Sequence, residues 1–379
     1  MPARSLIIVV VAALLAGCGG DGRPEPSKPA LPQLSPRLAR ALDTELRERV
    51  ANTGVPGASA AIVFADGRMW QAAAGDAVLE PRRAMTSDTA LPFDSVTKVA
   101  TGALALRLAE LGRLKLDDPI TRWYGGWRGD PDATVRDLLG HTSGLGDPPE
   151  RFWRHLLSNP RDRVTVREFI AATPKPGPRT SDAQYSNAGF AIAGLILERA
   201  AGEPVAAVMR REVLSAPGGD GLALQPAEAP RTPHAHSYWW PEGLTNDVAD
   251  VSDGGPLLPS RNWAGLAAMA GGMAGDVPSL ARWGHELLGG NVLSPTSLRE
   301  MTDFHDIEWP EGYGLGLMRD SLHDSVLWGH AGDGLGSHTE LWHAPRERLT
   351  IAVTWNDDMI DREGGTFEAL LSTALGEAL

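Results

Sequence analysis

The chain has 379 residues with 35 basic and 48 acidic side chains, a formal net charge of −13 and one cysteine, Cys18. A single cysteine excludes an intrachain disulfide and a cysteine-rich zinc site. The negative charge, with no lysine- or arginine-rich run to offset it, argues against nucleic acid as a partner. The length suits one large domain or two closely packed ones.

The N-terminal residues have the layout of an export signal. A basic start precedes ten consecutive apolar residues, 6–15, which are too few to span a bilayer as a helix. The sequence Leu-Ala-Gly-Cys at 15–18 resembles the bacterial lipobox, where the chain is cut before the cysteine and the thiol receives a lipid. We therefore expect residues 1–17 to be a lipoprotein signal peptide. Cys18 is then expected to anchor an exported protein to the bacterial cell membrane, on its periplasmic or cell-surface side. A plain cleaved signal with an incidental cysteine is the alternative. The proline-rich residues 18–36 predict an extended linker.

Strand-like segments lie at both ends of the chain, and helical periodicity marks the middle. The predicted strands are 58–64, 68–74, 325–330, 336–343 and 349–355, and the predicted terminal helices are 38–50 and 365–379. Strands from both ends can share one sheet only if the ends meet in space. We therefore predict an α/β (α+β) fold with an antiparallel five-stranded sheet, built from residues 37–105 plus 310–379 and flanked by N- and C-terminal helices. Residues 106–309 form an inserted, mostly helical domain in this prediction, with helices at 136–139, 185–201 and 278–288. The alternation in 349–355 predicts one buried face and one face turned elsewhere.

The first motif with chemical meaning is Ser95-Val96-Thr97-Lys98, which opens an apolar helix. A spacing of three places Ser95 and Lys98 on one helix face, so the amine can reach the hydroxyl. A serine hydroxyl is a weak nucleophile until a base removes its proton. Burial lowers the pKa of a lysine and a nearby cation adds to the effect, which would make Lys98 such a base. The alternative is a helix cap beside a lysine that extends to solvent.

The second motif is Tyr185-Ser186-Asn187, directly before an apolar helix. A phenol whose pKa is lowered by adjacent cations could pass a proton to a leaving group, and a carboxamide could hold a substrate amide or ester. The alternative is that Asn187 caps the helix while Tyr185 packs against it.

The third motif is Gly329-His330-Ala331-Gly332, at the end of a predicted strand. A lone histidine is usually structural, so its placement carries the argument. On an edge strand Gly332 would let a substrate backbone approach, and the next N–H group, of Asp333, could point at an oxyanion.

The order of these three motifs resembles that of the penicillin-recognising serine hydrolases. Tyr-X-Asn as the second motif is similar to the class C β-lactamase-like and D-alanyl-D-alanine carboxypeptidase branch, which also holds D-aminopeptidases and esterases. Segments 138–145, 270–272 and 280–283 are similar to the same branch. The resemblance covers residues 38–379 and implies a β-lactamase/transpeptidase-like fold.

The resemblance also implies two-step acyl transfer that requires no cofactor and no metal. Ser95 would attack a carbonyl carbon, with Lys98 and Tyr185 sharing the proton as base and then acid. The N–H groups of Ser95 and Asp333 would stabilise the oxyanion. Water would then release the acyl group.

The resemblance assigns substrate binding to Asn187, His330, Gly332 and Asp333. His330 is expected to supply positive charge beside the second motif. This chain has Ala331 where such enzymes usually carry a hydroxyl residue, and Asp333 adds negative charge where a substrate carboxylate would lie. Among small-molecule or peptidoglycan-derived substrates, a neutral ester or an amide with a free amine is therefore favoured. The protein is expected to be a monomer. A β-lactamase and a catalytically weak penicillin-binding sensor on the same fold are the alternatives.

Other candidate sites are weaker. His234-Ala235-His236 lacks the acidic neighbour and third histidine of a hydrolytic metal site. The acidic residues Asp247, Asp250 and Asp253 are interpreted as a solvated loop rather than a calcium site. The tryptophan pair 239–240 is expected to line the substrate mouth in preference to the core.

Overall fold

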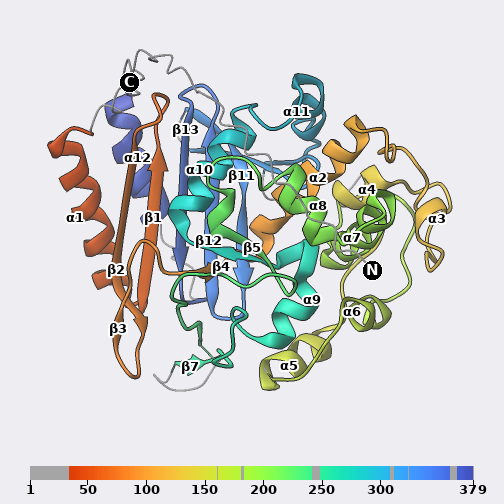
Figure 1. Ribbon diagram of the computed structural model, residues 1–379, viewed down its shortest axis with the longest axis horizontal. Coiled ribbons are helices and arrows are strands. Elements are labelled where there is room, and N and C mark those ends of the chain that lie inside the picture. The colour runs from red at the N-terminus through yellow and green to blue at the C-terminus, as the bar shows by residue number, and fades with distance from the viewer. Residues whose placement is uncertain are drawn as a thin grey trace, which may run out of the picture. The chain divides into compact units, whose positions relative to one another are not determined.

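The computed structural model in Figure 1 describes residues 34–159, 161–180, 183–240, 248–307, 311–322, 324–358 and 365–378. The expected signal peptide, Cys18 and the linker up to residue 33 lie outside the described residues. Within the described ranges, no helix combines the length and apolar character needed to cross a membrane. Gln33–Leu379 form one compact unit, and the domain boundaries expected inside it, at 105/106 and 309/310, stay predictions.

The fold begins with α1 (Pro36–Thr53), whose sequence explains both its ends and its packing. The hydroxyl of Ser35 caps the helix by accepting a hydrogen bond from the N–H of Leu38 at 3.1 Å, and Gly54 ends it at φ +76°. Apolar residues at four-residue intervals form its buried face: Leu38, Leu42, Leu46 and Val50. Because proline suits the first turn of a helix, Pro36 belongs to α1 rather than to the linker.

The central sheet is antiparallel, with the order β3-β2-β1-β13-β12-β11-β10-β9. Its strands are β1 (Gly57–Val63), β2 (Met69–Val78), β3 (Arg83–Ala84), β9 (Gly312–Tyr313), β10 (Met318–Leu322), β11 (Ser325–Gly334), β12 (Ser337–Ala344) and β13 (Leu349–Trp355). The five predicted strands are confirmed as β1, β2, β11, β12 and β13, and β1 pairs with β13, so the two ends of the chain do meet. Of the three added strands, β3 and β9 are too short for alternation to reveal them, and the sequence of β10 does not alternate.

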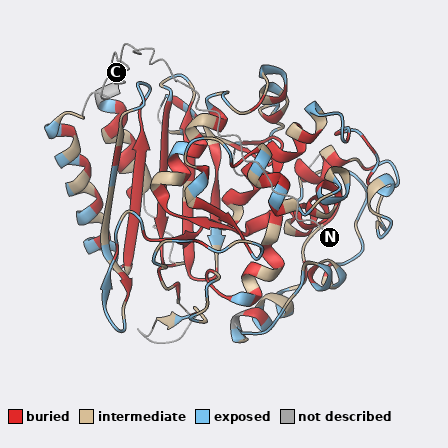
Figure 2. Ribbon diagram, viewed as in Figure 1, coloured by how far each residue is buried: buried red, intermediate tan, exposed pale blue. Residues whose placement is uncertain are grey.

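Helices cover both faces of this sheet (Figure 1). α1 and α12 (Thr366–Ala378) pack on one face, and α10 (Val277–Leu288) packs on the other. β13 is buried along its whole length. The second face of this strand, which the alternation in 349–355 predicted to be turned elsewhere, is therefore buried as well. The threonines on that face are satisfied by hydrogen bonds: Thr354 Oγ1 donates to the carbonyl of His338 at 3.0 Å. Figure 2 shows this burial continuing from the sheet into the helices of the middle region.

The middle of the chain is mainly helical. Its helices are α2 (Thr97–Glu110), α3 (Ile120–Trp123), α4 (Val135–Leu139), α5 (Glu150–Ser158), α6 (Val166–Ala172), α7 (Asn187–Ala201), α8 (Val205–Glu212), α9 (Arg261–Gly271) and α11 (Pro295–Met301), with 3-10 turns η1 (Asp94–Val96) and η2 (Gly219–Gly221). The predicted helices at 136–139, 185–201 and 278–288 correspond to α4, α7 and α10. Short strands also occur here, in a β4-β8-β5 sheet and a β6-β7 pair: β4 (Leu91–Pro92), β5 (Leu222–Leu224), β6 (Tyr238–Trp239), β7 (Ala249–Asp250) and β8 (Met273–Gly275).

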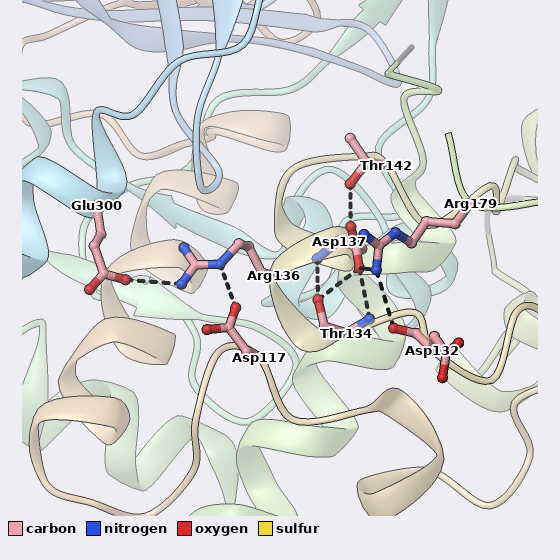
Figure 3. Close-up of polar contacts among 8 residues, drawn as sticks. All are labelled: Asp117, Asp132, Thr134, Arg136, Asp137, Thr142, Arg179 and Glu300. Carbon is pink, nitrogen blue, oxygen red and sulfur yellow. Dashed lines mark hydrogen bonds and ion pairs between the residues drawn. The ribbon is translucent and has the colours of Figure 1, made fainter. Parts of the chain in front are cut away.

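A polar cluster around α4 fixes the turn that leads to the site (Figure 3). Thr134 and Asp137 form a reciprocal capping box at the start of α4. The hydroxyl of Thr142 donates to the second carboxylate oxygen of Asp137 at 2.7 Å. Between them in the chain, His141 adopts a left-handed φ of +62°, and its ring lies 4.3 Å from that of Tyr185. The cluster thus holds the segment that carries His141, whose ring lies beside Tyr185 of the second motif.

Candidate active site

Ser95 and Lys98 lie together at the junction of η1 and α2. The Nζ of Lys98 donates hydrogen bonds to Ser95 Oγ at 2.8 Å, to Asn187 Oδ1 at 2.7 Å and to the carbonyl of Ala270 at 2.8 Å. Three short contacts fix the amine, and they bring the first and second motifs into one site.

Lys98 is completely buried, and burial lowers its pKa from 10.5 to about 7. The direction agrees with the sequence prediction, but part of the expected cause is wrong. The charged neighbours that act on Lys98 are the carboxylates of Asp147 and Asp94, which raise its pKa, rather than a second cation. Desolvation outweighs both carboxylates.

Tyr185 precedes α7, and its hydroxyl forms a hydrogen bond with Ser95. Its ring lies 4.8 Å from the Nζ of Lys98. Although 40 % of the residue is exposed, its hydroxyl end is desolvated, and this raises the pKa of Tyr185 above its ordinary value of 10.0. The carboxylates of Asp147 and Asp333 add to the rise. The predicted lowering of this pKa by nearby cations is therefore wrong, and the phenol keeps its proton at neutral pH.

Asn187 is the first residue of α7, and its amide is held from two sides. Its Oδ1 accepts from Lys98, and its Nδ2 donates to Asp147 Oδ2 at 2.7 Å. The helix is capped by Ser186, whose hydroxyl accepts from the N–H of Gly189 at 2.9 Å, so the alternative of Asn187 as the cap is wrong. No sequence pattern pointed to Asp147, because it follows a glycine-rich turn without periodicity and reaches the site only through the fold.

His330 lies on β11 with no exposed surface. Its Nδ1–H donates to the carbonyl of Ala331, which leaves Nε2 to accept from the hydroxyl of Tyr313 at 3.0 Å. Burial, together with the nearby Lys98, lowers the pKa of His330 to about 3. The imidazole is therefore neutral at pH 7, and the prediction that His330 supplies positive charge is wrong.

The end of β11 passes directly beside Ser95. A Cβ at Gly332 would overlap the carbonyl oxygen of Phe93 and would lie 3.1 Å from the backbone nitrogen of Ser95, so glycine is required for this approach. Gly334 pairs with Ser337 across a two-residue turn, and in such a ladder the N–H of Asp333 points away from β12. β10 pairs only with the first five residues of β11, so this part of β11 is a local edge among the described strands.

The carboxylate of Asp333 is turned toward a cation. It lies 2.7 Å from His338 Nδ1, and His338 Nε2 lies 2.9 Å from Glu340. Burial by itself would lower the pKa of His338, but hydrogen bonds to Asp333 and Glu340 raise it to about 10. The negative charge of Asp333, which was expected to repel a substrate carboxylate, is thus paired with the imidazolium of His338. Of the two features expected of Asp333, only the outward-pointing backbone N–H agrees with the structure.

A cavity of about 40 Å³ opens beside Ser95 and Asn187. Its apolar walls come from α5, α6 and α9: Trp153, Phe169, Trp263 and Leu266. The pair 239–240 is not among its lining residues, and Trp240 Nε1 donates to Asp357 at 2.7 Å. The prediction that this pair lines the substrate mouth therefore fails for this cavity, and Trp153 and Phe169 were missed.

The weaker candidates do not assemble into a site in the described chain. His236 Nδ1 lies 2.6 Å from Asp250, and no group of three potential metal ligands forms among the described residues. Asp247 lies outside the described residues, so the acidic-loop interpretation stays a prediction.

The sequence model of the family described as Beta-lactamase matches residues 42–373. The chain belongs to this Beta-lactamase family. Its fold is similar to that of a D-stereospecific amidohydrolase from Streptomyces sp., with a TM-score of 0.73 and 28 % identity over 87 % of this chain and 98 % of that one. The β-lactamase/transpeptidase-like fold expected from the motifs is confirmed.

Two curated relatives in the same family carry different activities in their names. Esterase EstB from Burkholderia gladioli is 32 % identical over 216 residues, which is 51 % of this chain and 50 % of that protein. A D-aminopeptidase from Brucella ovis is 27 % identical over 341 residues, which is 85 % of this chain and 60 % of that protein. The chain thus spans between half and 60 % of the length of these relatives.

Proposed function

We propose that this chain is a serine hydrolase that cleaves a small ester or a D-amino-acid amide or peptide through an acyl-enzyme on Ser95. The observation that carries the proposal is the completely buried Lys98, held 2.8 Å from the Ser95 hydroxyl. A buried amine that titrates near pH 7 is a general base matched to neutral conditions.

In the acylation step, neutral Lys98 accepts the proton of Ser95 as Oγ attacks the carbonyl carbon. Its two remaining N–H bonds stay directed at Asn187 Oδ1 and the carbonyl of Ala270. The negative charge that develops on the carbonyl oxygen is stabilised by the N–H groups of Ser95 and Asp333.

Tyr185 donates its proton to the leaving group in this mechanism. Its raised pKa keeps the phenol protonated, and its hydrogen bond with Ser95 places it beside the breaking bond. Lys98 returns the proton to Tyr185, and water then attacks the acyl-enzyme with the same groups in reverse roles. Neutral His330 supports Tyr313 and takes no part in proton transfer.

The cavity beside Ser95 favours a short, apolar acyl or side-chain group. A volume of about 40 Å³ is room for roughly three water-sized groups, at about 10–15 Å³ each. The aromatic walls favour an apolar group, and the polar part of a substrate would face Asn187 and Asp333 on the same lining. The names of the relatives, an esterase, a D-aminopeptidase and a D-stereospecific amidohydrolase, support this range of substrates.

The test combines covalent labelling with turnover. We expect a fluorophosphonate to label the purified protein at Ser95, as read by peptide mass spectrometry, and Ser95→Ala to abolish the label. The exposed Ser158→Ala is the matched control. Turnover is then measured on a nitrophenyl acetate, a D-alanine amide, a D-Ala-D-Ala peptide and a cephalosporin, each with and without EDTA. Labelling of Ser95→Ala at the wild-type level would contradict the proposal, whereas labelling without turnover of any substrate would favour the penicillin-binding sensor.

We further propose that the protein is exported and anchored through a lipid on Cys18, and that it acts as a monomer. The lipobox-like segment 15–18 and the proline-rich linker after it support this placement. Expression with a labelled fatty acid should label the wild type but not Cys18→Ala. Equal labelling of the two proteins would contradict the anchor, and a dimer mass in light scattering would contradict the monomer.

A further inference from the structure

Asp94, the residue immediately before the nucleophile, is a buried carboxyl group that the proposed reaction does not use. It has no exposed surface. Its Oδ1 accepts a hydrogen bond from the indole N–H of Trp263 at 3.0 Å, and its Oδ2 accepts one from the hydroxyl of Ser337 at 2.8 Å. Trp263 is part of α9 and lines the cavity beside Ser95, whereas Ser337 begins β12. One carboxyl group therefore joins the nucleophile turn, the cavity wall and the β11–β12 hairpin.

The backbone conformation of Asp94 and the close approach of Gly334 restrict the position of this carboxyl group. Asp94 has a left-handed φ of +48°, which residues other than glycine, asparagine and aspartate rarely adopt. A Cβ at Gly334, at the end of β11, would overlap the carboxyl group. This approach and the two hydrogen bonds confine the carboxyl group, and with it the backbone that leads into Ser95.

We propose that Asp94 is a positioning residue whose buried carboxyl group holds the turn carrying Ser95 against the cavity wall at Trp263 and the hairpin at Ser337. The inference rests on the proposed function in one respect, that Ser95 is the nucleophile. Because Ser95 follows Asp94 directly, a shift of this turn moves the attacking oxygen and one N–H donor to the oxyanion together. A displacement of about 1 Å in such a site costs about 10²-fold in rate.

Asp94 also faces the charged groups of the site. Desolvation raises the pKa of Asp94 to about 7, against the two hydrogen bonds, which lower it. From the hairpin, the carboxylate of Asp333 raises this pKa and the charge of His338 lowers it. From α2, Lys98 is the facing amine, and the negative charge of Asp94 raises the pKa of Lys98. A neutral amide at position 94 therefore lets Lys98 lose its proton at a lower pH.

The experiment measures the rate of fluorophosphonate labelling of Ser95 from about pH 5 to about pH 9. We expect Asp94→Gly, which accepts the left-handed backbone but removes the carboxyl group, to slow labelling about tenfold or more at its optimum. Asp94→Asn can keep both hydrogen bonds, because its amide oxygen accepts and its NH2 group donates, so it tests the charge alone and should move the acid limb of the profile to lower pH.

Asp118→Asn is the matched control for burial. Asp118 is also buried and also accepts from an indole N–H, that of Trp123, at 3.0 Å, but it lies outside the site. Its replacement should lower the melting temperature and leave the acid limb where it is. If Asp94→Asn likewise lowers the melting temperature and leaves the acid limb where it is, Asp94 has a purely structural role and the inference is overturned.

Trp263→Phe supplies an independent readout, since it keeps an aromatic wall and removes the donor to Asp94. We expect it to slow labelling, and the double variant with Asp94→Gly to be no slower than the slower single variant, because both substitutions remove the hydrogen bond between Asp94 and Trp263. Fully additive losses would overturn the inference. Failure of the wild type to label at Ser95 would instead overturn the proposed function, so the two failures are distinguishable.

Discussion

The Nζ of Lys98 lies 2.8 Å from the Oγ of Ser95, on a lysine that has no surface exposed to solvent. Proximity alone would give a charged amine that stabilises the hydroxyl but cannot accept its proton. Burial changes this, because it lowers the pKa of Lys98 to about 7 and so populates the neutral base at neutral pH.

The rate of acylation should therefore be half-maximal near pH 7 and level off at higher pH. Lys98→Met should lower kcat/KM by about 10²–10⁴-fold, the usual worth of a general base. The exposed Lys115→Met, a matched control, should leave both the rate and the profile unchanged. Stopped-flow release of nitrophenol across the pH range checks this, and a flat profile in the wild type would exclude Lys98 as the base.

Tyr185→Phe should affect amides more than activated esters. The raised pKa of Tyr185 keeps its proton available, and an amine must be protonated to leave, whereas nitrophenolate leaves without a proton. We expect a loss of about 10²-fold or more on a D-alanine amide and a clearly smaller loss on a nitrophenyl ester. Tyr238→Phe is the control, since that hydroxyl accepts from the N–H of Leu79 away from Ser95. Equal losses on both substrates would argue against Tyr185 as the proton donor.

Trp153→Ala should widen the cavity beside Ser95 and relax the selection for short groups. Removal of one aromatic wall from a cavity of about 40 Å³ admits a longer acyl chain. The ratio of kcat/KM for a nitrophenyl hexanoate to that for the acetate should rise about tenfold, the discrimination expected for a few methylene groups. The same ratio should stay constant in Trp240→Ala, and a constant ratio in both variants would show that acyl groups do not enter this cavity.

His338 should make a pH-dependent contribution to stability. Its hydrogen bonds to Asp333 and Glu340 raise its pKa from 6.5 to about 10, so the folded state holds the proton more tightly than the unfolded chain. This stabilisation is fully present below pH 6.5 and is lost as the pH rises through about 10. The difference in unfolding free energy between the wild type and His338→Gln should therefore shrink over that window. Urea unfolding at several pH values measures it, with His155→Gln as the exposed control, and a constant difference would contradict the assignment.

Asp137→Ala should destabilise the fold without entering the chemistry. It removes the capping box with Thr134 and the hydrogen bond from Thr142 (Figure 3), a loss of about 1–2 kcal/mol. Thermal unfolding measures the change, and the exposed Asp132→Ala should be close to neutral. An unchanged melting temperature in Asp137→Ala would show that the cluster does not support α4.

Much of the fold was predictable from local patterns. Apolar strand-like runs located the five long strands, with alternation in 349–355, and helical spacing over 38–50 located α1. Strands of two or three residues are too short to show a period, and β10, with the sequence Met-Arg-Asp-Ser-Leu, does not alternate. In the site, Ser95 and Lys98 were recognisable because three residues along one helix bring two side chains to the same face.

The order of residues along the chain shows which groups are available for chemistry: one serine and lysine at helical spacing, one Tyr-X-Asn and one His-X-Gly, in a fixed order. The tertiary structure set their electrostatic states, because desolvation depends on what packs around a group from distant parts of the chain. It made His330 neutral, kept Tyr185 protonated, and paired Asp333 with His338, each against the expectation from sequence. It also brought Trp263 to Asp94 and Asp147 to Asn187 through contacts that no sequence period encodes.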